Sequence, residues 1–129
     1  MILLDTDICI EVLRKNENII NKRAQYDDAT AVSFMSVAEL YYGAERSSNT
    51  VKNRFLIEEF LLTIEIIHTD IEILKKFGEL KEQLYKENFL LPDADIFIAA
   101  TTYVKADKLI TGNTKHFQRF PNLVIENWQ

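Results

Sequence analysis

The segment Ile2-Leu3-Leu4-Asp5-Thr6-Asp7-Ile8 joins a short apolar run directly to two carboxylates. Its first three residues are wholly apolar, as expected for a strand that is buried on both faces of a parallel sheet. The residues that follow, 7–14, predict a helix, because their apolar side chains recur at helical spacing. A buried strand that ends at a carboxylate and leads into a helix is the first half of a βαβ unit.

The rest of the chain alternates in the same way. Further strands are expected at residues 30–34, 64–67, 109–111 and 123–125. Further helices are expected at residues 17–25, 36–46, 50–62, 70–86 and 93–105. The last of these helices is apolar nearly all round, which predicts a central position. This alternation predicts an α/β fold with a central parallel sheet of four to five strands flanked by helices. The length of 129 residues fits a single domain.

The composition excludes several classes of site. The three glycines, Gly43, Gly78 and Gly112, are too far apart for a dinucleotide-binding turn or a P-loop. The single cysteine, Cys9, excludes internal disulfides and multi-cysteine zinc sites, and it is expected to be buried. A net charge of −5 gives little general attraction to nucleic acid or to anionic membranes.

The chain carries no recognisable targeting or membrane segment. A carboxylate, Asp5, interrupts the N-terminal apolar run before a signal peptide could form, and no apolar run approaches the ~20 residues of a membrane helix. We therefore expect a cytoplasmic protein without a membrane partner.

Polar side chains gather at the expected ends of the strands. Asp5 follows the first strand, and residues Thr111 and Asn113 follow a later one. Three more carboxylates lie near the starts of helices that follow strands: Glu39, Asp93 and Asp95. In a parallel sheet these groups meet at one edge, where the carboxylates would repel one another unless a cation neutralised them. Oxygen ligands favour Mg²⁺ or Mn²⁺, so the residues alone indicate a metal-dependent hydrolase of phosphate esters.

Each of these side chains also has a structural interpretation. Asp93 or Asp95 could cap its helix, and Ser36-x-x-Glu39 fits a capping box. Asp7 is expected to cap the first helix rather than bind metal directly, and Asn113 could be a turn residue. A basic group follows Asn113 and could contact substrate phosphates or form a solvated turn: Lys115, His116 and Arg119.

Four segments resemble the motifs of PIN-domain ribonucleases, in the same order along the chain. They are Leu3-Leu4-Asp5-Thr6-Asp7-Ile8-Cys9-Ile10; Ser36-Val37-Ala38-Glu39-Leu40 followed by Tyr42-Gly43-Ala44-Glu45; Pro92-Asp93-Ala94-Asp95 followed by Ile98-Ala99-Ala100; and Leu109-Ile110-Thr111-Gly112-Asn113-Thr114 followed by Phe117. The resemblance spans the whole chain. It implies a single PIN-like domain over residues 1–129 and, more narrowly, a VapC-type toxin of a toxin–antitoxin system.

The resemblance implies catalytic roles for Asp5, Glu39 and Asp95, which would hold Mg²⁺ or Mn²⁺. Asn113 stands at a fourth catalytic position where many members carry aspartate, with Thr111 in support. Two further residues are implied as accessory groups: Asp7 and Asp93. The implied reaction is hydrolysis of an RNA phosphodiester, with tRNA, such as initiator tRNA, as a candidate substrate. The implied partners are a VapB-type antitoxin and a second copy of the chain.

We also considered three other interpretations of these residues. Leu3-Leu4-Asp5-Thr6-Asp7 also fits a haloacid-dehalogenase-like phosphatase with Asp5 as nucleophile, although the chain is short for that fold. A phosphoacceptor receiver fits poorly, because no lysine follows the last expected strand. A PIN-like module that only binds a partner is disfavoured, because it would have no need for three catalytic acids.

Overall fold

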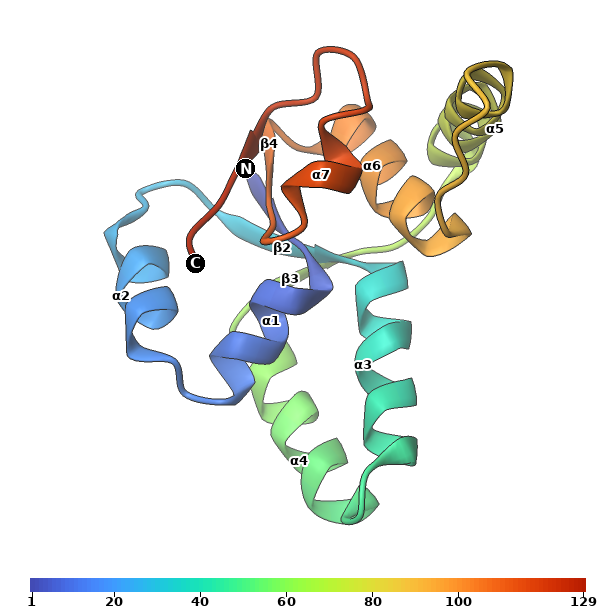
Figure 1. The fold of residues 1–129 in the computed structure, drawn as a ribbon. Coiled ribbons are helices and arrows are strands. Elements are labelled where there is room, and N and C mark those ends of the chain that lie inside the picture. Colours follow the sequence, from blue (N-terminus) through green and yellow to red (C-terminus); the bar gives the residue numbers. More distant parts are fainter.

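A computed structural model describes residues 1–129 as a five-stranded parallel sheet in the order β3-β2-β1-β4-β5, with helices on both faces (Figure 1). The strands are β1 (Ile2–Leu4), β2 (Thr30–Ser33), β3 (Glu65–Ile67), β4 (Lys108–Ile110) and β5 (Ile125–Glu126). The helices are α1 (Thr6–Leu13), α2 (Glu17–Gln25), α3 (Phe34–Arg46), α4 (Thr50–Leu61), α5 (Ile71–Lys86), α6 (Asp93–Lys105) and α7 (Thr114–Phe117). The α/β class and the parallel sheet expected from the sequence are confirmed.

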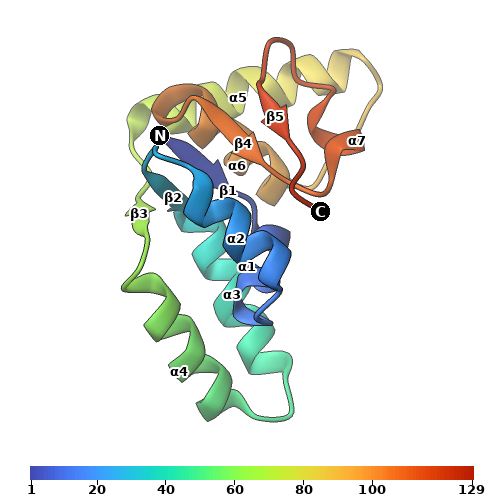
Figure 2. The ribbon, with the colours of Figure 1, turned by 90° about the vertical axis from the view of Figure 1, so that its left-hand side faces the viewer.

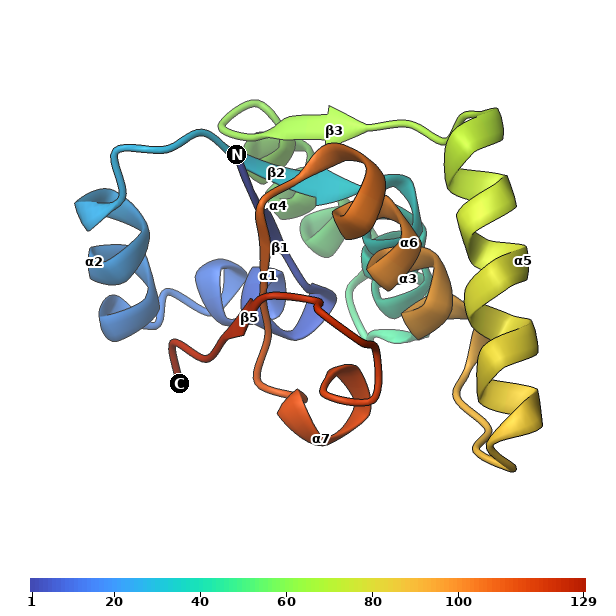
Figure 3. The same ribbon diagram turned by 90° about the horizontal axis from the view of Figure 1, so that it is seen from above.

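Strand β1 lies at the centre of the sheet. It pairs with β2 through Ile2↔Thr30 and with β4 through Leu3↔Leu109. Alternate residues of β1 enter two separate cores, because successive strand side chains point to opposite faces. Leu3 packs with residues of α5, α6 and α7, whereas Ile2 and Leu4 pack with residues of α1 to α4. Figure 3 looks onto the sheet, with α6 in front of the strands and α3 and α4 behind them.

Helix α6 is buried along most of its length, as its apolar composition predicted. Helices α3 and α4 form an antiparallel pair that extends away from the sheet (Figure 2). No helix of the chain is long and apolar enough to cross a membrane.

Most boundaries lie within one or two residues of the expected ones, and two differences in the last third of the chain need a separate explanation. Helix α7 was not expected, because its four residues are too few to show a periodic pattern. Strand β5 begins at Ile125, where residues 123–125 were predicted, because the segment before it is a turn in which the Leu123 N–H bonds the Phe120 carbonyl. Neither difference alters the sheet order or the edge at which the strands end.

Candidate active site

One pocket opens at the carboxyl ends of the strands. Its volume is about 250 Å³, and its lining brings together side chains that are far apart in the sequence. The lining residues are Asp5, Thr6, Asp7, Ile10, Glu39, Asp95 and Asn113. They come from the N-cap and body of α1, from α3, from the first turn of α6 and from the residue before α7. The pocket contains no lysine or arginine, so nothing in its lining neutralises the four carboxylates.

Asp5 is the most deeply buried of the lining residues, with 6% of its surface exposed. Its side chain caps α1 by accepting a hydrogen bond from the Thr6 N–H (2.8 Å), and it accepts a second from the Thr111 hydroxyl (2.7 Å). Burial raises the pKa of Asp5 to about 7, and the nearby Asp7 carboxylate adds to the rise. The hydrogen bond from Thr111 acts in the opposite direction, because it stabilises the ionised form.

Asp7 does not cap α1, so that expectation was wrong. The helix begins one residue earlier than expected, at Thr6, and its N-cap is Asp5. Instead Asp7 Oδ2 accepts a hydrogen bond from the backbone N–H of Gly112 (2.9 Å), just beyond the end of β4. The other oxygen, Asp7 Oδ1, is buried and has no hydrogen-bond partner. Burial raises the pKa of Asp7.

Glu39 does not form the capping box that the sequence suggested. Helix α3 starts at Phe34, and its N-cap is Ser33, whose hydroxyl accepts a hydrogen bond from the Ser36 N–H (3.1 Å). Glu39 therefore lies in the second turn, where Glu39 Oε1 accepts a hydrogen bond from the Thr6 hydroxyl (2.7 Å). The first residue of α1 thus orients the one acidic side chain that α3 contributes to the pocket.

Asp95 and Asp93 occupy different surroundings. The N-cap of α6 is Pro92, and neither carboxylate caps the helix with its side chain. Asp95 faces the pocket, and Asp95 Oδ2 lies 2.9 Å from His116 Nδ1 of α7. Asp93 is exposed, does not line the pocket and pairs with Lys81 of α5 at 2.9 Å.

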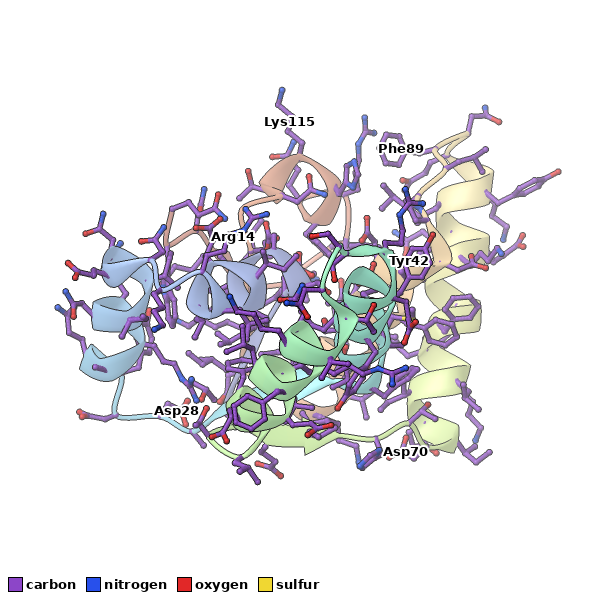
Figure 4. The ribbon with its side chains drawn as sticks, turned by 90° about the horizontal axis from the view of Figure 1, so that it is seen from below. Arg14, Asp28, Tyr42, Asp70, Phe89 and Lys115 are labelled. Atoms are coloured by element: carbon purple, nitrogen blue, oxygen red, sulfur yellow. The ribbon has the colours of Figure 1, made fainter.

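Helix α7 supplies the remaining polar groups. Asn113 precedes the helix, and Asn113 Nδ2 lies 2.8 Å from His116 Nδ1, so His116 contacts both Asn113 and Asp95. Lys115 is exposed and forms no ion pair, and the exposed Arg119 lies over the ring of Phe89, 3.9 Å from its centroid. Figure 4 shows Lys115 and Phe89 projecting on one side of the molecule, with Asp28 and Asp70 on the other.

Three contributors to this region were not singled out from the sequence. Thr6 orients Glu39, Ile10 lines the pocket, and Phe89 stacks with Arg119. Thr6 stands between the two aspartates of the first motif, and this position was its only sequence signal. Cys9, expected to be buried, is buried within the core.

The donor set fits a hard divalent cation. Its side-chain atoms are carboxylate, amide and hydroxyl oxygens, which Mg²⁺ and Mn²⁺ prefer. The hydrogen bonds to Glu39 and Asp95 each use one oxygen, so the second oxygen of each carboxylate has no protein partner. No three acidic, histidine or cysteine side chains are already drawn together at metal-binding distances. The carboxylates would therefore have to close around a cation.

Comparison with known proteins places this chain in a family. Residues 2–123 match the model of the PIN domain. The chain is 35% identical over 127 residues to ribonuclease VapC2 of Haemophilus influenzae, covering 98% of this chain and 96% of the relative. It is 26% identical over 127 residues, with the same coverage, to the tRNA(fMet)-specific endonuclease VapC of Salmonella typhimurium.

A solved structure is similar over its full length. The crystal structure of VapBC2 from Rickettsia felis, bound to a DNA fragment from its promoter, contains a chain that is 31% identical to this one. The match covers 100% of both chains with a TM-score of 0.94. The likeness therefore includes the whole sheet and every helix that borders the pocket.

Proposed function

Because this chain belongs to the PIN-domain family and, within it, to the VapC ribonucleases, we propose that it is a metal-dependent endoribonuclease toxin that is neutralised by a VapB-type antitoxin. The observation that carries the proposal is the convergence of Asp5, Glu39 and Asp95 on one pocket at the strand ends. The single domain over residues 1–129 and a cytoplasmic site of action are part of the same proposal.

We assign the metal ligands to Asp5, Glu39 and Asp95, with Mg²⁺ or Mn²⁺ as the cation. When bound, the cation would polarise a phosphodiester oxygen and favour ionisation of a water molecule. The protein's own contribution is orientation. Thr111 holds Asp5, Thr6 holds Glu39, and His116, through Nδ1–H, holds Asp95. Thr111 thus acts through the carboxylate that it positions, whereas Asn113 lines the pocket itself.

The proposed reaction is attack by water on the phosphorus of an RNA phosphodiester. The bond from phosphorus to the 3′ oxygen breaks, so the products carry a 5′-phosphate and a 3′-hydroxyl. Lys115 and Arg119 are exposed and follow the pocket residue Asn113 by two and six positions, so they are candidates to contact the backbone phosphates of RNA. A relative is named a tRNA(fMet)-specific endonuclease, which makes initiator tRNA the first substrate to test.

The proposed partner is a VapB-type antitoxin, because similar structures are VapBC complexes from Rickettsia felis and Haemophilus influenzae. The acidic pocket and the net charge of −5 favour a segment with basic side chains. Apolar side chains exposed on α3 and α4, Tyr42 (63%), Phe55 (58%) and Leu62 (83%), are candidate contacts with the antitoxin or with a second copy. Tyr41, also considered from the sequence, packs partly buried against the core.

The test is cleavage of tRNA by the purified chain with Mg²⁺, with Mn²⁺ or with EDTA. Cleavage should require the metal and should be lost in Asp5→Asn and Asp95→Asn. Asp93→Asn is the matched control, since Asp93 lies in the same motif but outside the pocket lining. A phosphoaspartate trapped on Asp5 would instead identify a phosphatase. Metal binding without cleavage of any RNA would identify a binding module.

A further inference from the structure

In the whole chain, one buried side-chain oxygen or nitrogen lacks a hydrogen-bond partner, and it is Asp7 Oδ1. Buried polar groups are almost always paired, because leaving one unpaired costs free energy. This atom belongs to a residue that lines the acidic pocket. The single exception in the molecule therefore lies at the site where a cation is proposed to bind.

Asp7 lies in the first turn of α1, where the backbone N–H groups of Ile8 and Asp7 favour its ionised form and lower its pKa against the effect of burial. The N-cap of α1 is already filled by Asp5, so the helix does not require a second carboxylate there. The other oxygen, Asp7 Oδ2, is held by the Gly112 N–H at 2.9 Å. A Cβ atom at Gly112 would lie 2.8 Å from Asp7 Oδ2, so this close approach depends on glycine. The backbone beyond β4 thus orients the Asp7 carboxylate through Oδ2, and Oδ1 has no hydrogen-bond partner.

No positive charge compensates this carboxylate. Asp7 forms no ion pair, and the pocket lining contains no lysine or arginine. Two acidic side chains act on it or beside it: Asp95, whose charge raises the pKa of Asp7, and Asp5, which is itself buried. Across the pocket, the residue after Gly112 is the neutral Asn113 rather than an acid. A divalent cation bound here would neutralise this buried, unpaired carboxylate oxygen, and the neighbouring side-chain oxygens are ligands that such a cation prefers.

We propose that Asp7 Oδ1 is a direct ligand of the divalent cation, and that Asp7 supplies a fourth carboxylate beside Asp5, Glu39 and Asp95. This inference rests on the proposed metal site and adds a residue to it. It requires that cation affinity depend on the charge of residue 7 and not only on the shape of its side chain. Asp7→Asn separates these properties, because an amide oxygen can still accept the Gly112 N–H but carries no charge.

The experiment is a titration of the full chain with Mn²⁺ in the absence of RNA, in which electron paramagnetic resonance measures the concentration of free Mn²⁺. We expect Asp7→Asn to weaken Mn²⁺ binding by about tenfold or more, as loss of a metal-site partner does. The matched control, Asp93→Asn, should bind like the unaltered chain, because Asp93 pairs with Lys81 outside the pocket. The metal-free melting temperature of Asp7→Asn should not fall, because the contact with Gly112 is kept.

A second measurement needs no variant. In a ¹³C NMR titration of the unaltered chain with Mg²⁺, the carboxyl resonances of Asp5 and Asp7 should shift together, whereas that of Asp93 should not. If Asp5 responds and Asp7 does not, or if Asp7→Asn binds Mn²⁺ as tightly as the unaltered chain, the inference is overturned and the proposed ribonuclease stands. If the unaltered chain binds no Mn²⁺ at millimolar concentration, both the inference and the metal-dependent function fail.

Discussion

The Thr111 hydroxyl donates a 2.7 Å hydrogen bond to Asp5 Oδ2 and so connects the ends of β4 and β1. The two residues are 106 positions apart in the sequence, yet both are buried at the carboxyl ends of adjacent strands. This bond is the main side-chain interaction that favours the ionised form of Asp5 against the effect of burial. Its removal should therefore be visible in the titration of Asp5.

We predict that Thr111→Val raises the pKa of Asp5 above its value of about 7. A hydrogen bond to a charged group contributes about 1.5–3 kcal/mol, and one pKa unit corresponds to about 1.4 kcal/mol, so the rise should be about one unit or more. A ¹³C NMR titration of the Asp5 carboxyl in EDTA measures it. Thr111→Ser keeps the hydroxyl and should titrate like the unaltered chain; an unchanged midpoint in Thr111→Val would contradict the assigned role.

The pKa of Asp5 also predicts how the stability of the metal-free protein depends on pH. The pKa rises from the ordinary 3.8 to about 7 on folding, so between these values the native state binds more protons than the unfolded state. The free energy of unfolding should therefore fall as pH increases from about 4 to about 7, by up to about 4 kcal/mol from this group. Urea denaturation in EDTA at pH 5 and pH 8 tests this.

The control for this pH dependence is Asp5→Asn, which cannot ionise at residue 5. It should flatten the pH dependence and should be more stable than the unaltered chain at pH 8. A pH profile with the same slope in both proteins would show that other groups cause the effect.

Thr6 should control the orientation of Glu39, because its hydroxyl donates the 2.7 Å hydrogen bond to Glu39 Oε1. We predict that Thr6→Val, which preserves the shape of the side chain, lowers the rate of RNA cleavage about 10- to 100-fold, the range for loss of a partner that orients a metal ligand. Thr6→Ser should retain most of the rate. Equal rates in the Val and Ser variants would mean that the bond does not position Glu39.

The sequence predicted the sheet and the edge at which the site lies, because both follow from local patterns. Short apolar runs marked the buried strands, and Asp5 could be placed directly after β1 without any knowledge of tertiary contacts. The gathering of Asp5, Glu39 and Asp95 then followed from the rule that parallel strands end at one edge.

The roles of individual side chains were harder to predict, since they depend on contacts between distant segments. A shift of the expected helix starts by one or two residues was enough to assign the caps to Asp7 and Ser36 instead of Asp5 and Ser33. No local pattern reports that Thr6 meets Glu39, or that the backbone of Gly112 meets Asp7. These long-range hydrogen bonds fix how the side chains at the pocket are oriented.

Lys115 should bind RNA through a backbone phosphate, because it is exposed on α7, forms no ion pair and follows the pocket residue Asn113 by two positions. We predict that Lys115→Ala weakens RNA binding and lowers the slope of log affinity against log salt concentration by about one, the value for a single lost phosphate contact. Filter binding to tRNA over a range of salt concentrations, in EDTA to prevent cleavage, measures both quantities. Lys75→Ala is the matched control, since Lys75 pairs with Glu72 on α5, away from the pocket. If both variants change the slope equally, the RNA contact is not localised at α7.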